Sequence, residues 1–339
     1  MKVSDFDFDL PNELIATHPL DQRDASRMLL VPGNEDKHIT DFISYLRPGD
    51  VVVFNNSKVI PARFDAAASD GTKYEITLHT TSGNDWLGFA KKFNKLKVGE
   101  ILTLGDSTKI EVLDKNDDSG LLLKFHCENL SAGALAKEDV FDVLDRVGKM
   151  PLPPYMKREE EQTDRERYQT VYADPAGSMA APTAGLHFTP QLLDAVRAAG
   201  AQIVNITLHV GAGTWAPVKS DDTAQHKMHS EWGCITVEQA AIINAAKRVI
   251  AVGTTSLRLL ESAGGKPFCG TTDIFITPGY KFKVVDVLLT NFHLPRSTLF
   301  MLVSAFAGLA EMRAAYAHAV LEKYRFFSYG DCCLLFRKN

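Results

Sequence analysis

Two histidines in this sequence stand beside turns that are rich in glycine and threonine. His187 closes the segment APTAGLH, and His209 comes just before GAGT in the segment ITLHVGAGT. Histidine exchanges a proton readily near neutral pH, and such turns often carry ligand contacts. The pattern therefore predicts one substrate-binding site with both histidines as candidate catalytic groups. The turn residues expected to bind substrate are Thr183, Gly185, Gly211, Gly213 and Thr214.

A third histidine lies in the proline-containing segment TNFHLPRSTL. His293 and Arg296 precede a strongly apolar stretch there, and Ser297 is a good N-cap for the helix expected next. Polar loops at the carboxyl ends of strands are where α/β enzymes keep reactive groups, which favours a catalytic His293 and a substrate-binding Arg296. The alternative is that Arg296 pairs with a surface acid and His293 caps a turn.

The segment AVGTTSLR has the composition of a strand-to-helix turn that binds anions. Val249 to Val252 predicts a short buried strand, and Gly253 opens the helix that follows. The free N–H groups and the positive end of such a helix suit a carboxylate or a phosphate. An ordinary α/β connection has the same composition, so this alternative stays open. The candidate ligands are Thr254, Thr255, Ser256 and Arg258.

Weaker patterns occur in the same half of the chain. The glycine spacing of GAGTWA fits a dinucleotide fingerprint, but Pro217 stands where the helix should open, so a tight turn is favoured. His226 and His229 have i, i+3 spacing, yet zinc needs at least three protein ligands, and no metal site is predicted. Nearby Glu231 is an acid–base or substrate-orienting candidate. Tyr172 could stack on a purine, although packing is the commoner role of such a residue.

The elements that position these residues follow from local signals. Thr189 and Pro190 predict the start of a helix that ends at Gly200, and Gln202 to Val210 predicts a strand with His209 at its carboxyl end. Thr236 opens another expected helix that reaches about residue 248. After residue 150 helices alternate with strands, which is typical of an α/β domain with a mixed or largely parallel sheet. Ligands bind at the carboxyl edge of such sheets.

The segment from about residue 65 to 148 has a different pattern. Short strands there are separated by turn residues, which predicts an inserted antiparallel domain that resembles a small β-barrel. Residues 1–64 and 149–339 would then form one discontinuous α/β domain, and the two connections between the domains should lie close together. The strands expected in the insert are Tyr74 to Leu78, Trp86 to Ala90, Ile101 to Leu104, Lys109 to Leu113 and Leu121 to Phe125.

Composition limits how the protein can contact nucleic acid. The 339 residues, 45% of them hydrophobic, suffice for two cores, and the formal net charge of −5 excludes a general RNA-coating surface. RNA contacts should therefore be focal. The insert itself has 10 basic and 15 acidic residues, so a solvated hairpin is at least as good an interpretation of its lysine-rich turn. The two candidate patches are Lys92 with Lys95 in the insert, and Lys281 with Lys283 beside Arg296.

No targeting or membrane segment is evident in the sequence. Acidic residues occupy the start, MKVSDFDFDL, where a signal peptide would have an apolar run. The apolar stretch Leu299 to Ala310 is shorter than the ~20 residues of a membrane span and predicts a buried helix. The five cysteines are odd in number and form no CxxC, which argues against a disulfide framework. These features predict a cytoplasmic protein.

Several motifs in order resemble one known family. These are VVVFNNSKVIPARF, YQTVYA, AAPTAGLHFT, LHVGAGT, MHSE, VGTTSLRLLES, TDIFITPGYKFKVVDVLLTNFHLPRSTLFMLVSAFAG and YRFFSYGD. The sequence is similar, over almost its whole length, to the S-adenosylmethionine:tRNA ribosyltransferase-isomerases of queuosine biosynthesis. It departs from the usual pattern at Met179, at Trp215 and at Cys332–Cys333, where apolar replacements affect packing.

The resemblance implies an unusual reaction. S-adenosylmethionine would donate its ribosyl group to 7-aminomethyl-7-deazaguanine at the tRNA wobble position, giving epoxyqueuosine-tRNA, adenine and methionine. S-adenosylmethionine is then a consumed substrate, no cofactor is needed, and no obligate protein partner is evident. The implied fold is an α/β domain interrupted by a small β-barrel. A ribosyl transfer of this kind requires a base, a proton donor for adenine and a neutral amine.

Within that reaction, His187 and His209 are the first candidates for proton transfer, and His293 and Glu231 are the second. Arg258 or Arg296 would hold the methionine carboxylate or a tRNA phosphate. The alternative function is an S-adenosylmethionine-dependent RNA methyltransferase, which would release S-adenosylhomocysteine. A non-catalytic RNA-binding module is a further alternative, disfavoured by the negative charge.

Overall fold

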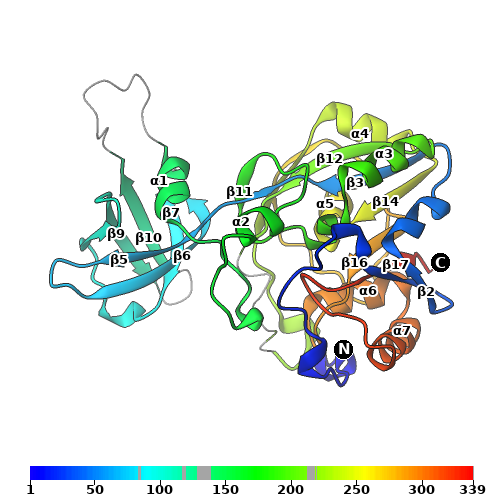
Figure 1. Ribbon diagram of the computed structural model, residues 1–339, viewed down its shortest axis with the longest axis horizontal. Coiled ribbons are helices and arrows are strands. Elements are labelled where there is room, and N and C mark those ends of the chain that lie inside the picture. The colour runs from blue at the N-terminus through cyan, green and yellow to red at the C-terminus, as the bar shows by residue number, and fades with distance from the viewer. Residues whose placement is uncertain (83–84, 117–119, 128–138, 212–217, 219, 339) are drawn as a thin grey trace.

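The fold was analysed in a computed structural model, which describes residues 1–82, 85–116, 120–127, 139–211, 218 and 220–338. Its main part is a nine-stranded sheet flanked by helices (Figure 1). Four neighbouring strands at its centre are parallel, whereas the outer pairs are antiparallel, apart from β1 and β17. The expected mixed α/β sheet is thus confirmed. In spatial order the strands are β15 (Phe268–Thr272), β13 (Glu231–Ile235), β12 (Gln202–Leu208), β3 (Asp50–Asn55), β14 (Arg248–Val252), β16 (Val287–Asn291), β17 (Cys332–Phe336), β1 (Arg27–Val31) and β2 (Glu35–His38).

Strand β3 shows how one sheet serves two cores. All six of its residues are buried, as expected for a central parallel strand covered on both faces. Because side chains alternate along a strand, Val51 and Val53 enter one core, while Val52 and Phe54 enter the other. The first core includes residues of α4 (Val237–Asn244), α5 (Thr254–Ala263), α6 (Thr298–Ala307) and α7 (Leu309–Leu321), and the second includes α3 (Pro190–Ala198) and the 3₁₀ helix η4 (Ile39–Tyr45).

The helices begin at the capping residues that the sequence predicts. The Thr189 hydroxyl accepts a hydrogen bond from Leu192 N–H at 3.1 Å, and Ser297 caps α6 in the same way. Thr236 and Gln239 form the expected capping box, but α4 ends at Asn244 rather than near residue 248. The chain turns earlier because Arg248 already belongs to β14, where its guanidinium pairs with Asp50 at 2.6 Å.

Helix α6 is almost entirely buried, as predicted for the apolar stretch after Ser297. Gly308, with φ of +100°, separates it from α7, and the two helices are bent by 116° at this break. Within the described ranges no single helix is long and apolar enough to cross a membrane, and only this bent pair reaches the required length and composition together.

Six antiparallel strands form a closed barrel that projects from one end of the main sheet (Figure 1). The barrel has its own core, which Val143 and Leu144 of α1 (Val140–Val147) join. The expected barrel-like insert is confirmed, with β5 as a strand that sequence periodicity missed. The two connections meet, since Arg63 and Lys149 exchange backbone hydrogen bonds of 3.2 and 2.6 Å. The barrel strands are β5 (Arg63–Ala67), β6 (Lys73–Ser82), β7 (Asp85–Ala90), β8 (Ile101–Leu104), β9 (Lys109–Asn116) and β10 (Gly120–His126).

Short elements link the barrel to the sheet. Strands β4 (Lys58–Val59) and β11 (Ala176–Ser178) pair in parallel, and α2 (Asp164–Arg167) lies between them in sequence. The cysteines also depart from the expectation of no disulfides. Cys234 of β13 and Cys269 of β15 are directly opposite in the antiparallel register, and their sulfurs are bonded.

Candidate active site

The larger of the two cavities described here lies at the carboxyl edge of the parallel strands, where the fold class predicts ligands. It encloses about 540 Å³, including space open to solvent. Strands β14 and β16 both end in it, and the segment from Ala180 to Ala184 covers one side. Its other lining residues are Tyr168, Val210, Gly253, Thr254, Thr255, Thr290, Asn291, Phe292, His293, Leu299, Phe327 and Ser328.

The first turn of α5 forms one wall of this cavity. Gly253 has φ of +88°, which lets the chain pass from β14 directly into the helix. Thr254 and Thr255 line the cavity, and the buried Thr255 hydroxyl has no hydrogen-bond partner. Ser256 instead donates to the Val252 carbonyl at 2.8 Å, so it does not face a ligand. The helix terminus and the Thr255 hydroxyl together suit an anionic group.

His293 lies in the cavity at the end of β16. Its Nε2 is 3.1 Å from the Thr290 hydroxyl, and its backbone N–H donates to the Tyr316 hydroxyl at 2.9 Å. Burial lowers the pKa of His293 to about 3, so the imidazole is neutral at pH 7. A neutral ring fixed by both contacts can accept a proton from, or donate one to, a bound substrate.

Asn291 is a lining residue that sequence reasoning missed. Its Nδ2 donates to the Phe327 carbonyl at 3.0 Å, which leaves the buried Oδ1 without a partner. The sequence feature that could have identified Asn291 is its place in the TNFH segment, at the carboxyl end of a buried strand. Because an unpartnered buried acceptor is costly, Asn291 can accept a hydrogen bond either from His187, whose pKa its side chain raises, or from a ligand.

His187 lines a second, smaller cavity that adjoins the first at Ser328. Its Nδ1 is 2.9 Å from the Ser26 hydroxyl, and no described residue lies within hydrogen-bonding geometry of its buried Nε2. Burial lowers the pKa of His187 to about 4, although the neighbouring Asn291 amide opposes the shift. The neutral imidazole therefore has one nitrogen available for proton transfer.

His209 lies in neither of these cavities, because it follows the end of β12 with its ring turned to the face opposite Val210. The Ser57 hydroxyl is 2.6 Å from its Nδ1, and the ring stacks on Trp232 with centroids 5.3 Å apart. Burial lowers its pKa. Gly177 makes room for the ring, since a Cβ there would lie 2.7 Å from it.

Glu231 and Arg258 are joined in a buried ion pair, with each side chain only 4% exposed. The second carboxylate oxygen of Glu231 accepts a hydrogen bond from Gly211 N–H at 3.1 Å. Neither side chain lines the two cavities. The pair instead fixes the start of the glycine-rich turn after β12. Two further candidates, Gly213 and Thr214, lie outside the described residues.

Gly185 and Tyr172 form a close contact. A Cβ at position 185 would lie 2.1 Å from the Tyr172 hydroxyl, so only glycine fits there. The Tyr172 ring packs on Phe54, and burial raises its pKa. Of the candidates in this segment, Thr183 alone lines the larger cavity.

The remaining basic candidates lie on the surface, outside the lining of both cavities. Arg296 is exposed, with φ of +57°. Lys281 and Lys283 are also exposed, and the Glu261 carboxylate accepts hydrogen bonds from the backbone N–H groups of Lys283 and Val284. The exposed Lys92 and Lys95 flank a turn of the barrel. Among the described residues, no group of three or more His, Cys, Asp or Glu side chains is arranged to hold a metal ion.

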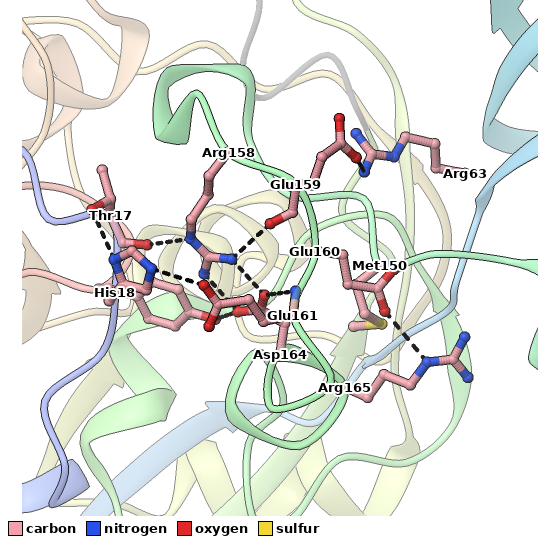
Figure 2. A network of polar contacts seen from close by, with 11 residues as sticks. Thr17, His18, Arg63, Met150, Arg158, Glu159, Glu160, Glu161, Asp164 and Arg165 are labelled. Atoms are coloured by element: carbon pink, nitrogen blue, oxygen red, sulfur yellow. Dashed lines mark hydrogen bonds and ion pairs between the residues drawn. The ribbon is translucent and has the colours of Figure 1, made fainter.

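A polar network ties the connection after the barrel to the N-terminal segment (Figure 2). Arg158 makes two hydrogen bonds of 2.7 Å to Asp164 and one of 2.9 Å to the Thr17 carbonyl. The Tyr329 hydroxyl also donates to Asp164, at 3.0 Å. Burial alone would raise the pKa of Asp164, but these hydrogen bonds hold it below its usual value. The network thereby fixes Tyr329, which lines the smaller cavity.

Comparison with known proteins identifies the family of this chain. A family model described as queuosine biosynthesis protein matches residues 3–335. Relatives from Methylocella silvestris and Parvibaculum lavamentivorans, each named S-adenosylmethionine:tRNA ribosyltransferase-isomerase, are 50% identical, with 99% of this chain and 98% or 99% of theirs covered. The crystal structure of an S-adenosylmethionine tRNA ribosyltransferase from Thermotoga maritima is 33% identical with a TM-score of 0.53, and the match covers 98% of this chain and 99% of that one. The chain therefore belongs to the queuosine biosynthesis protein family.

Proposed function

We propose that this protein is an S-adenosylmethionine:tRNA ribosyltransferase-isomerase. It transfers and isomerises the ribosyl group of S-adenosylmethionine onto 7-aminomethyl-7-deazaguanine at the tRNA wobble position and releases adenine and methionine. The observation that carries this proposal is the larger cavity, which unites the APTAGLH, VGTTS and TNFH segments at one sheet edge. The tRNA substrate places the reaction in the cytoplasm.

The cavity offers separate places for the parts of S-adenosylmethionine. The methionine carboxylate suits the N–H groups of Thr254 and Thr255, because a helix N-terminus favours an anion. Thr183 faces the same space. The unpartnered Oδ1 of Asn291 is an acceptor for an amino group, either of adenine or of the methionine moiety. No metal is required for this arrangement.

Proton transfer falls to histidines that are neutral at pH 7. We assign His293 as the base that removes the acidified C–H proton beside the sulfonium, because it alone of the three described site histidines lines the larger cavity. His187 lines the adjoining cavity beside Asn291 and is assigned to protonate adenine or to accept a proton from the incoming ammonium.

His209 and Glu231 act as positioning residues. His209 anchors the end of β12 through Ser57 and Trp232, and Glu231 holds Gly211. Both therefore fix the chain between His209 and Gly211, and Gly213 and Thr214, which follow in the sequence, remain proposed substrate contacts. We further assign the exposed Arg296 and the patches at Lys281 with Lys283 and at Lys92 with Lys95 to outer contacts with tRNA phosphates.

Product analysis tests this function. The purified protein is incubated with S-adenosylmethionine and tRNA carrying 7-aminomethyl-7-deazaguanine, and the small molecules are resolved by liquid chromatography and mass spectrometry. Adenine and methionine should appear in equal amounts, and the control tRNA with guanine at the wobble position should release neither. S-adenosylhomocysteine as the main product would instead establish the methyltransferase alternative.

A further inference from the structure

The smaller cavity is lined by an unusual concentration of cationic groups. It encloses about 290 Å³, including space open to solvent, and adjoins the larger cavity at Ser328. Arg23 and Arg167 line it together with His187 and Ser26. Arg325 lies near enough for its charge, with that of Arg23, to lower the pKa of His187.

Backbone carbonyls, rather than carboxylates, hold the three guanidinium groups. Arg23 donates to the carbonyls of Glu166 and Leu186, at 2.9 and 3.4 Å. Arg167 donates to those of Asp21 and Leu20, at 3.0 and 2.5 Å, and Arg325 donates to that of His18. These bonds orient the guanidiniums without neutralising them. Within the described part of the chain, none of the three has a carboxylate oxygen within 4.0 Å.

The nearest acidic side chains are already engaged or exposed. Asp164 accepts hydrogen bonds from the two terminal nitrogens of Arg158 (Figure 2). Asp331 accepts the backbone N–H groups of Arg27 and Arg325 and lies 3.6 Å from the Arg27 side chain. Glu166 is exposed, and its attraction for Arg23 is weaker than the repulsion from Arg167, so burial and that repulsion lower the pKa of Arg23.

Several buried donors in this region lack a hydrogen-bond partner within the part of the chain that the structure describes. They are Nε of Arg167 and Nη1 of Arg325, and the buried Nε2 of His187 is also unpartnered. Unsatisfied buried N–H groups are costly, and the guanidiniums of Arg23 and Arg325 are compensated only in part by Glu166 and Asp331, so the cluster adds repulsion. One bound oxyanion would relieve both costs, since a phosphate accepts several charge-assisted hydrogen bonds from guanidinium groups.

We propose that the smaller cavity binds a backbone phosphate of the substrate tRNA beside the wobble nucleotide, through Arg23 and Arg167, with the charge of Arg325 nearby adding to the attraction. This inference rests on the proposed function, in which the wobble base enters the larger cavity. A nucleotide whose base occupies that cavity must leave its phosphate in an adjoining space, and the two cavities share Ser328. The methionine carboxylate is the other oxyanion of the reaction, and the α5 terminus already provides a place for it.

Charge removal tests the site against a matched control. Arg23→Gln and Arg167→Gln each remove one guanidinium from the cavity. Arg165→Gln is the control, because Arg165 lies on the same helix and also donates to carbonyls, yet it pairs with Glu160 away from the cavity. Affinities for tRNA and for S-adenosylmethionine are measured separately across a range of salt concentrations, and circular dichroism checks the fold.

Each cavity variant should bind tRNA about tenfold to a hundredfold more weakly, which is the usual effect of losing a charge-assisted hydrogen bond. The slope of log affinity against log salt should become shallower by about 0.7 to 0.9 for one lost phosphate contact. Affinity for S-adenosylmethionine should stay within about twofold, and Arg165→Gln should match the wild type in every measurement. Weaker S-adenosylmethionine binding with normal tRNA binding would overturn the proposal in favour of the carboxylate.

A second measurement also uses the wild-type protein, so it does not depend on the variants alone. Single phosphates of the anticodon loop are replaced by neutral methylphosphonates in tRNA ligated from synthetic halves. At one position next to the wobble nucleotide, the methylphosphonate should weaken tRNA binding to the wild type but cause little further loss of affinity in Arg167→Gln. If no such position exists while adenine release from wild type is normal, the phosphate site is wrong and the proposed function stands. Absence of adenine release would contradict the proposed function itself.

Discussion

Variants of the buried pair of Glu231 and Arg258 can distinguish a structural role of Glu231 from a catalytic one. Glu231→Gln keeps the shape of the side chain and an oxygen for Gly211 N–H, but it removes the only charge that is paired with Arg258 within the described residues. Both side chains are 4% exposed, and Nη2 of Arg258 already lacks a partner. Leaving such a guanidinium uncompensated costs about 3 to 5 kcal/mol of unfolding free energy.

The assay is urea unfolding followed by tryptophan fluorescence in a Trp86→Phe background. Trp86 belongs to the barrel, so Trp232 of β13 is the tryptophan that remains among the described residues, and it reports on the main domain. The double variant Glu231→Gln/Arg258→Met should recover part of the loss, because it removes both buried charges. Asp194→Asn is the control. It breaks the exposed pair with Arg197 and should change the unfolding free energy by less than about 1 kcal/mol.

Adenine release measured on the same variants completes the test. A positioning role predicts that Glu231→Gln and Arg258→Met lose activity together, through the turn at Gly211. The reasoning would be refuted if Glu231→Gln unfolded at the wild-type urea concentration while turnover fell by about a hundredfold or more. That result would make Glu231 a proton-transfer group and would leave Arg258 satisfied by other contacts.

Three further predictions concern the cavity histidines and the contact between Gly185 and Tyr172. His293→Ala and His187→Ala should each lower turnover at saturating substrate by about a hundredfold or more with folding intact, and near-normal turnover would remove that residue from the proton-transfer scheme. Gly185→Ala should destabilise the fold, because its Cβ would lie 2.1 Å from the Tyr172 hydroxyl. Adding Tyr172→Phe to this variant should partly restore the melting temperature. No recovery would show that another contact is responsible. Stability should fall as pH drops from about 6.5 towards 4, because the unfolded chain protonates His187 and His293 while burial keeps both neutral in the fold. The free energy of unfolding should fall by about 1.4 kcal/mol per pH unit for each histidine, and in His293→Gln only the contribution of His187 should remain. A urea midpoint that does not change over this pH range would contradict the prediction.

Local physics explains why parts of the fold were predictable from sequence. The caps at Thr189 and Ser297 depend on hydrogen bonds to residues three positions away, and the alternation in β12 depends on a period of two. The turn at Gly253 could be predicted because an apolar strand pattern is followed directly by the start of a helix. Such signals involve neighbours in sequence, so they predicted the barrel insert, the α/β sheet and the sheet edge that holds the cavity.

Tertiary structure alone decided which side chains meet. Glu231 and Arg258 were separate candidates until β13 packed beside α5, and His187 meets Ser26 across 161 positions. His209 shares a segment with Val210, but strand alternation turns the two to opposite faces, so only Val210 lines the larger cavity. Sequence periodicity determines that a strand exists and which of its residues share a face. It does not encode strand order or which face meets the ligand, because those depend on packing between distant segments.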